Sequence, residues 1–257
     1  MAAGARVPSV GGMPTEISAA PAGPAGGPVA IVTGASRGLG LALATGLASA
    51  GWRLVVDART AGPLTGAAAG LAALTTVVAL PGDVTDPAHR RALADAADRL
   101  GGPDLLVNNA GILGPSPQPP LADYPPAALR EVYEVNVVAP LALARTVLPG
   151  LRRRGGSVVN ITSDAAVEPY PGWGGYGSAK AALDQAGRVL AAEEPDVRVW
   201  AFDPGDLRTR MHQEAFPGED ISDRPLPETV VPAFLRLLST RPASGRLRAS
   251  DLLAEVS

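Results

Sequence analysis

The 257-residue sequence contains no cysteine, which excludes disulfide bonds, thiolate nucleophiles and metal sites built on cysteine. Only two histidines are present, His89 and His212, so the sequence also argues against a histidine-rich metal site. No uninterrupted apolar run approaches the ~18 residues of a membrane-spanning helix, and we expect no membrane span. A net charge of -3 argues against binding along the phosphate backbone of a nucleic acid. The composition therefore predicts a soluble cytoplasmic protein without a metal.

Lysine occurs once, at Lys180, and all other cationic side chains are arginines. Tyr176 stands four residues earlier, and residues four apart lie on the same face of a helix. A neighbouring ammonium group lowers the pKa of a phenol, which is about 10 when unperturbed. Such a phenol can exchange a proton with an alcohol oxygen. Taken alone, however, a pair of this kind is also common on the solvated face of an amphipathic helix.

The amino-terminal segment differs in composition from the rest of the chain. Residues 1–27 are rich in glycine, proline and alanine, show no apolar periodicity and lack the pattern of a secretory signal. We predict a disordered tail there, excluded from the fold, or a start codon placed too early. Residues 28–257 have the length of one large α/β domain, and the 46% hydrophobic content of the chain predicts a substantial core.

Short apolar runs alternate with helix-period segments from residue 28 onward. We predict strands at residues 29–32, 53–57, 76–80, 104–107, 157–161 and 197–202, with an edge strand at 244–247. Helices are predicted from the glycine loop to about residue 50, and then at 64–74, 87–100, 127–154, 176–193 and 228–238. This alternation predicts right-handed βαβ units, which form a doubly wound parallel sheet in a three-layer α/β/α single domain.

Glycines and polar residues gather where the predicted strands end, which is where ligands bind in such sheets. Gly34, Gly38 and Gly40 follow the first strand and open a helix, so a pyrophosphate could approach the helix N-terminus there. Glycine also makes plain turns, but the place of these three between strand and helix favours nucleotide binding. Asp83 and Asn109 end the third and fourth strands, where each could hold adenine or merely stop a strand.

Six motifs in order make the chain resemble the short-chain dehydrogenase/reductase superfamily, in its compact branch. They are the glycine loop 33–40, the N-N-A-G run 108–111, Asn136, the strand end 160–163, the Y-x-x-x-K run 176–180 and the P-G-x-x-x-T run 204–209. The family's spacing of thirteen residues before the tyrosine selects Ser163 rather than Thr162 as its serine. The resemblance covers residues 28–209 and implies a Rossmann-type fold.

The resemblance implies an oxidoreductase that interconverts a carbonyl and an alcohol by hydride transfer. Tyr176 would be the general acid/base, Lys180 would lower its pKa, and Ser163 would hydrogen-bond the substrate oxygen. Asn136 would hold a water that links Lys180 to solvent. The implied cofactor-binding residues are Gly34, Ser36, Arg37, Gly38, Leu39, Gly40, Arg59, Asp83, Val84, Asn109, Ala110, Gly111, Tyr176, Lys180, Pro204, Gly205, Leu207 and Thr209.

The choice between NADP and NAD depends on the end of the second strand, where an acid suits the ribose hydroxyl of NAD and an arginine suits the phosphate of NADP. Asp57 lies near this position, but the family's discriminating acid aligns with Ala58. Arg59 follows, and Arg37 lies within the glycine loop. The arginines favour NADP(H) and a carbonyl reductase, with NAD possible because of Asp57.

Residues 206–227 are predicted to form a lid over the substrate. The expected pocket residues are Leu113, Ser163, Tyr170, Trp173, Tyr176, Met211 and His212, although an exposed loop position is the commoner one for such a histidine. Asp164, directly after the serine, has no explanation at this stage. The resemblance implies a small-molecule substrate and a homodimer or homotetramer.

Two other classes of protein remain as alternatives. A nucleotide-binding sensor or scaffold could keep the fold and lose the chemistry, but such proteins usually lose the tyrosine and lysine that are present here. An epimerase or dehydratase of the family's extended branch would have a different glycine spacing and a longer carboxyl-terminal domain.

Overall fold

The computed structural model describes residues 17–19 and 26–254, and a single eight-stranded sheet lies at its centre in the order β1-β4-β3-β2-β5-β6-β7-β8. Seven strands are parallel: β2 (Val29–Val32), β3 (Arg53–Ala58), β4 (Val77–Pro81), β5 (Leu105–Asn108), β6 (Ser157–Ile161), β7 (Arg198–Asp203) and β8 (Gly245–Arg248). The central strands β2, β5 and β6 are buried along their whole length, as expected where helices cover both faces of a parallel sheet.

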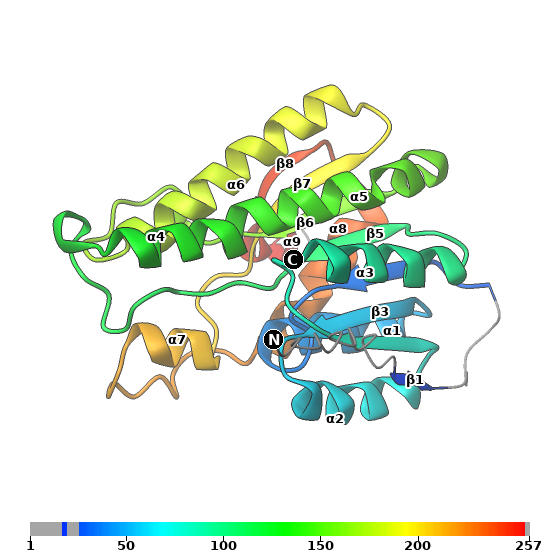
Figure 1. Cartoon of the computed structure of the whole chain (residues 1–257), viewed down its shortest axis with the longest axis horizontal. Helices are drawn as coiled ribbons and strands as arrows, with labels where there is room; N and C mark the ends of the chain where they lie inside the picture. Colours follow the sequence, from blue (N-terminus) through cyan, green and yellow to red (C-terminus); the bar gives the residue numbers. More distant parts are fainter. Residues whose placement is uncertain (1–16, 20–25, 255–257) are drawn as a thin grey trace, which may run out of the picture.

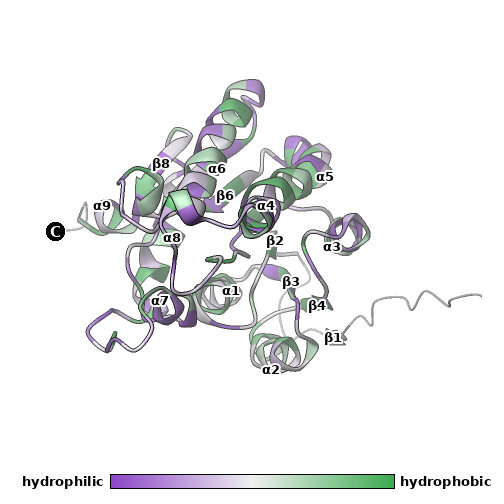
Figure 2. Cartoon of the chain, turned by 60° about the vertical axis from the view of Figure 1, so that its left-hand side comes forward, coloured by the Kyte–Doolittle hydropathy of each residue, from purple (hydrophilic) through white to green (hydrophobic). Residues whose placement is uncertain are grey.

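Two helix layers cover the sheet (Figures 1 and 2). One apolar cluster joins it to α1 (Gly38–Ser49), α2 (Ala61–Ala72), α8 (Val231–Thr240) and α9 (Ala249–Ala254). A second cluster joins the opposite face to α3 (Pro87–Arg99), α5 (Ala139–Arg154) and α6 (Gly174–Glu193). The prediction of a doubly wound α/β/α sheet is therefore confirmed. The Asp86 carboxylate caps α3 by accepting from the Ala88 N–H at 2.8 Å.

The exclusion of residues 1–27 from the fold is wrong for one short segment. Strand β1 (Ile17–Ala19) pairs antiparallel with residues 77–79 of β4. The edge of β4 offers backbone N–H and C=O groups, and pairing with them requires extended backbone rather than apolar periodicity. Gly27 is also held, because its carbonyl accepts from the Arg53 guanidinium at 2.8 Å. The rest of the predicted tail, residues 1–16 and 20–25, lies outside the described residues.

The helix predicted at 127–154 consists of three consecutive helical segments. α4 (Pro126–Tyr133) passes into a π-helical turn, η2 (Glu134–Val138), which continues as α5. By length and composition this helix could cross a membrane, but 50% of its most apolar stretch is buried in the fold. Its apolar side packs on α3 and on the sheet, so it is a core helix.

The parallel register brings the carboxyl ends of β2 to β7 to one edge of the sheet. The segment after β7 contains α7 (Arg210–Ala215), a helix that the sequence analysis did not predict within the lid region 206–227. The Thr209 side chain caps α7 by accepting from the His212 N–H at 3.2 Å. Figure 1 shows α7 beyond one end of the sheet, apart from the two helix layers.

Candidate active site

A cleft of about 1010 Å³ opens at the carboxyl ends of the strands. It brings together every residue that the sequence analysis placed in a cofactor or substrate site, from Gly34 in the glycine loop to His212 on α7. Among the predicted catalytic residues, Ser163, Tyr176 and Lys180 line this cleft and Asn136 does not. Five of the six motifs, although far apart in the sequence, therefore contribute to one continuous surface.

The glycine loop is held against the end of β5. The Asn109 side-chain amide donates to the carbonyls of Thr33 at 2.8 Å and Gly34 at 3.2 Å. Gly34 has a φ of +67°, and a Cβ placed there would lie 3.0 Å from the Ala110 Cα. Asn109, which the sequence suggested as a ligand for adenine, thus uses its amide N–H groups to fix the loop. The close backbone approach explains why glycine is needed at position 34.

Asp57 is buried, and each of its two carboxylate oxygens has a partner within the protein. Its Oδ1 accepts from the Gly34 N–H at 2.7 Å, and its Oδ2 lies 3.0 Å from the His89 Nε2. Burial raises the pKa of Asp57, while these two hydrogen bonds oppose the shift. The carboxylate therefore supports the glycine loop from behind. Two exposed arginines near it, Arg37 and Arg59, line the cleft.

Tyr176 and Lys180 both lie on α6 and both are buried, at 8% and 4% exposure. The Lys180 Nζ is 5.4 Å from the centre of the Tyr176 ring and donates to the Ile161 carbonyl at 2.8 Å. Burial lowers the pKa of Lys180 to about 8. Burial, and then the charges of Asp203 and Asp164, raise the pKa of Tyr176 above its ordinary value of 10.0.

The expectation that Lys180 lowers the pKa of Tyr176 is therefore wrong for this structure. Sequence spacing placed the two groups together correctly, but it could not show that both lose contact with water. Loss of hydration disfavours the charged form of each group, the tyrosinate and the ammonium alike. Two carboxylates from other elements, Asp203 and Asp164, act on the phenol in the same direction as burial.

Ser163 forms a small hydroxyl network with Asp164. Its Oγ donates to the Asp164 Oδ1 at 2.9 Å and accepts from the Ala165 N–H at 3.2 Å. The other oxygen of Asp164 accepts from the Tyr170 hydroxyl at 2.9 Å. Asp164, which had no explanation from sequence, thus organises the serine and a tyrosine in the cleft lining.

Asn136 lies on the π-helical turn η2 and is completely buried. Its Oδ1 accepts from the Ile112 N–H at 2.9 Å, and its Nδ2 donates to the Ile112 carbonyl at 2.8 Å. The side chain therefore pins the backbone that follows the N-N-A-G run. A π turn places one extra residue in the helix, and such turns are frequent at functional sites.

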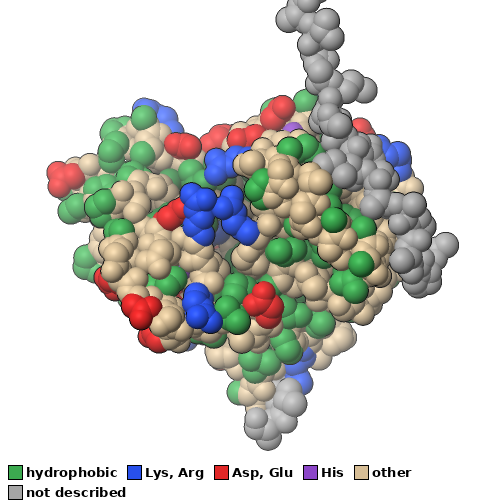
Figure 3. All heavy atoms as spheres, turned by 90° about the horizontal axis from the view of Figure 1, so that it is seen from below, with side chains coloured by type: hydrophobic (Ala, Val, Ile, Leu, Met, Phe, Trp, Pro, Cys, Tyr) green, Lys and Arg blue, Asp and Glu red, His purple; other side chains and the backbone are tan. Residues whose placement is uncertain are grey.

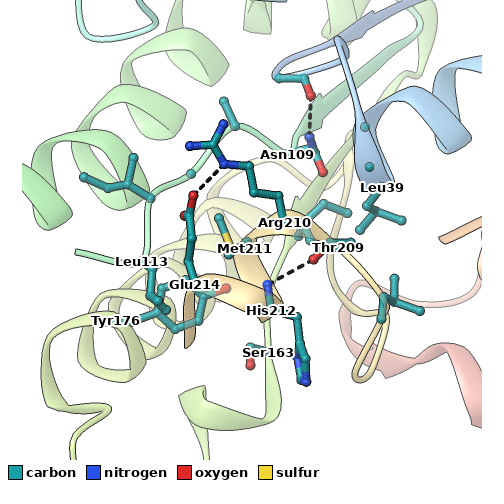
Figure 4. Close-up of a pocket in the computed structure, with 18 of the residues that line it drawn as sticks. Leu39, Asn109, Leu113, Ser163, Tyr176, Thr209, Arg210, Met211, His212 and Glu214 are labelled. Carbon is teal, nitrogen blue, oxygen red and sulfur yellow. Dashed lines mark hydrogen bonds and ion pairs between the residues drawn. The ribbon is translucent and has the colours of Figure 1, made fainter. Parts of the chain in front are cut away.

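Aromatic side chains form the wall of the cleft opposite the glycine loop. The Trp173 ring packs at 5.9 Å from Tyr176 and 6.0 Å from Phe216, measured between ring centres. Leu113 and Met211 belong to the same apolar cluster as Tyr176, and Figure 4 shows α7 presenting Met211 and His212 to the pocket.

The alternative of an exposed loop position for His212 is wrong. The side chain lies on α7, is 9% exposed and packs 4.9 Å from the Phe216 ring. The sequence analysis also did not single out Ile112, Val135, Arg208 and Arg210, which line the cleft. Arg210 forms an i,i+4 ion pair with Glu214 at 2.7 Å, and this spacing was the available signal for a helix there.

The cleft has the features needed for a dinucleotide. Glycine lets the backbone approach at residue 34, and α1 begins at Gly38 with no side-chain hydrogen bond from the preceding Arg37. Backbone N–H groups at such a helix start can hold a pyrophosphate. Figure 3 shows basic side chains gathered beside a hollow, and four arginines line the cleft, Arg37, Arg59, Arg208 and Arg210. The residues present therefore fit an anionic dinucleotide.

Comparison with known proteins agrees with this reading of the site. A family model described as short chain dehydrogenase matches residues 28–220. Sepiapterin reductase of Meriones unguiculatus is 38% identical over 204 residues, covering 73% of this chain and 77% of that protein. The 1-deoxy-11-beta-hydroxypentalenate dehydrogenase of Streptomyces arenae is 38% identical over 192 residues, covering 71% of this chain and 68% of that protein.

Among solved structures, the alcohol dehydrogenase of Thermococcus sibiricus complexed with 5-hydroxy-NADP is similar, with a TM-score of 0.78 and 30% identity. The similarity covers 86% of this chain and 95% of that one. The chain belongs to the short-chain dehydrogenase/reductase family. It is an NAD(P)-binding oxidoreductase that acts on carbonyl and alcohol substrates.

Proposed function

We propose that the protein is an NADP(H)-dependent carbonyl reductase in which Tyr176 donates the proton to the carbonyl oxygen. The observation that carries this proposal is the state of Tyr176 in the cleft. Burial and the charges of Asp203 and Asp164 raise the pKa of the phenol, so the phenol stays protonated at neutral pH. A proton donor requires this protonated form. When bound, the cofactor supplies or accepts the hydride.

The neighbouring side chains complete the proposed chemistry. The Ser163 hydroxyl, which lines the same cleft as Tyr176, hydrogen-bonds the substrate oxygen and stabilises negative charge that develops there. To do so it turns from the Asp164 carboxylate, its present acceptor. Lys180 holds the cofactor ribose, and Asn136 fixes the loop after residue 111 through Ile112. In this proposal Asn136 is a positioning residue, because the oxygen and the nitrogen of its side-chain amide are both hydrogen-bonded to the Ile112 backbone.

The preference for NADP(H) rests on the surroundings of the second strand. Asp57, the acid that could bind the ribose hydroxyls of NAD, already accepts from Gly34 and faces His89. Arg37 and Arg59 are exposed in the cleft lining, where a guanidinium suits a phosphate. The protein of Thermococcus sibiricus, solved with 5-hydroxy-NADP, is consistent with this choice.

The lid at 206–227, a homodimer or homotetramer, and a cytoplasmic location remain parts of the proposal. By their names, two of the relatives are a sepiapterin reductase and a 1-deoxy-11-beta-hydroxypentalenate dehydrogenase. The aromatic wall of Trp173 and Phe216 suits substrates with an apolar surface. A silent sensor that binds NADP(H) is the competing candidate.

Oxidation of NADPH and NADH with a panel of aldehydes and ketones tests the proposal. We expect wild type to oxidise NADPH faster than NADH, and Tyr176→Phe to lose turnover by at least about a hundredfold because the proton donor is gone. Tyr133→Phe, which removes a hydroxyl from α4 outside the cleft, is the matched control. Cofactor binding by every variant, without turnover by wild type on a widened panel, would favour the sensor.

A further inference from the structure

Arg246 joins the edge of the sheet to the active site. It lies on β8, and its side chain reaches past β7 to the end of β6, with 13% of it exposed. One end of the guanidinium, Nη1, donates to the Asp184 Oδ2 at 2.8 Å and the Thr162 Oγ1 at 3.2 Å. The other end, Nη2, donates to the Asp203 Oδ2 at 2.6 Å and the Ser163 carbonyl at 3.0 Å.

The four acceptors belong to the three elements that surround the reacting groups. Thr162 and Ser163 directly follow β6, so the bond to the Ser163 carbonyl fixes the backbone that carries the Oγ. Asp184 lies one turn after Lys180 on α6, the helix that also carries Tyr176. Asp203 ends β7. The Arg246 guanidinium therefore links the backbone of Ser163 to α6, the helix that carries Tyr176 and Lys180.

The same contacts place one cation between two buried carboxylates. Asp184 is 6% exposed and Asp203 is 4% exposed, and the second oxygen of Asp184 has no hydrogen-bond partner among the described residues. The Asp184 charge acts on Lys180, and the Asp203 charge acts on Tyr176. The other charged groups that bear on this region are Asp164, which acts on Tyr176, and Arg248, which acts on Asp203.

We propose that Arg246 is a positioning residue of the active site, which holds Ser163 in register with α6 and offsets the charges of Asp184 and Asp203 beside Lys180 and Tyr176. The inference rests on the proposed function for the roles of these three residues. The contacts of the guanidinium with Asp184, Asp203 and the Ser163 carbonyl do not depend on that function.

The chain offers a direct probe of this arrangement, because Lys180 is its only lysine. Protein grown with ¹³C-labelled lysine gives one lysine side-chain NMR signal, whose titration reports the pKa of Lys180. Arg246→Met removes a cation and takes away the hydrogen bond that Asp184 accepts from it, so we expect the Lys180 midpoint to rise by about half a pH unit or more.

Two further variants separate charge from damage to the fold. Arg241→Met removes an arginine that contacts the opposite end of β6, at Ser157 and Gly155, and we expect it to leave the Lys180 midpoint unchanged. Adding Asp184→Asn to Arg246→Met removes the unpaired carboxylate, and we expect the midpoint to return toward the wild-type value.

Kinetics provide the second readout on the same proteins. We expect Arg246→Met to lower kcat at least tenfold with little change in the dissociation constant for NADPH. We also expect the curve of alcohol-oxidation rate against pH to shift to higher pH. An unchanged Lys180 midpoint in a folded, NADPH-binding Arg246→Met protein overturns the proposal. If wild type turns over no carbonyl, the proposed function fails, while the lysine titration still decides the role of Arg246.

Discussion

The residue with the most unexpected role is Asp164. Two hydroxyl groups, those of Ser163 and Tyr170, donate to its carboxylate in the lining of the cleft. Its negative charge is also one of the causes that raise the pKa of Tyr176. An acid at this place favours the neutral phenol over the tyrosinate, and therefore favours proton donation to a carbonyl over proton removal from an alcohol.

We expect Asp164→Asn to make alcohol oxidation possible at lower pH. The amide keeps the size of the side chain and removes its charge, so the raised pKa of Tyr176 falls toward 10.0. Since oxidation needs the tyrosinate, its rate rises as pH passes through this pKa, and the rising limb should move down by about half to one pH unit. The measurement is kcat/KM for alcohol oxidation as a function of pH.

Glu168→Gln is the matched control for this prediction. Glu168 is an exposed acid near the same segment whose charge acts on Tyr170 rather than on Tyr176. We expect its profile to coincide with that of wild type. A profile of Asp164→Asn that also coincides with wild type would show that the Asp164 charge does not reach the phenol.

Sequence predicted which residues meet in the cleft better than it predicted what they do there. The motif residues Ser163, Tyr176 and Lys180 come together because short spacings and strand ends determine their places. The pKa of Tyr176 was predicted in the wrong direction because it depends on burial and on Asp203, which is distant in the sequence. The burial of His212 was missed for the same reason, since α7 packs it against Phe216.

At the scale of elements, the π turn η2 shows how a helix can serve both the core and the site. The sequence predicted one continuous helix, because α-helical and π-helical turns have almost the same apolar pattern over five residues. Asn136 in this turn is completely buried, and its side-chain amide accepts from the Ile112 N–H and donates to the Ile112 carbonyl. The turn therefore fixes the loop after Gly111 from inside the helix layer.

We expect Asn136→Ala to destabilise the protein by about 2 kcal/mol, because it leaves the partly buried N–H and C=O of Ile112 without their partner. For a chain of this size the melting temperature should fall by roughly 4–8 °C. Val138→Ala, which shortens a half-exposed side chain in the same turn, should change it little. An Asn136→Ala protein as stable as wild type but inactive would favour the water relay instead.

At the scale of the whole molecule, the seven parallel strands followed from the alternation of apolar runs, and the eighth did not. Strand β1 joins the sheet through its backbone, and a three-residue extended segment carries no periodic signal. The place of the cleft, by contrast, follows from the topology. The chain adds strands on one side of β2, beginning with β3, and then on its other side, beginning with β5. Ligands bind in such sheets at the point where the strand order reverses. Cofactor recognition is therefore a property of the assembled sheet edge, and cofactor binding should stabilise the whole fold.

We expect NADP⁺ to raise the melting temperature more than NAD⁺ does at equal concentration. A ligand at a hundred times its dissociation constant stabilises the folded state by about 2.7 kcal/mol, which is roughly 5–10 °C for a chain of this size. Arg37→Gln combined with Arg59→Gln should abolish the difference between the two cofactors, whereas Arg130→Gln on α4, outside the cleft, should preserve it. Equal stabilisation by NAD⁺ and NADP⁺ would mean that neither arginine binds the phosphate that distinguishes NADP⁺ from NAD⁺. Because this measurement needs no substrate, it tests the cofactor preference independently of the catalytic roles of Ser163, Tyr176 and Lys180.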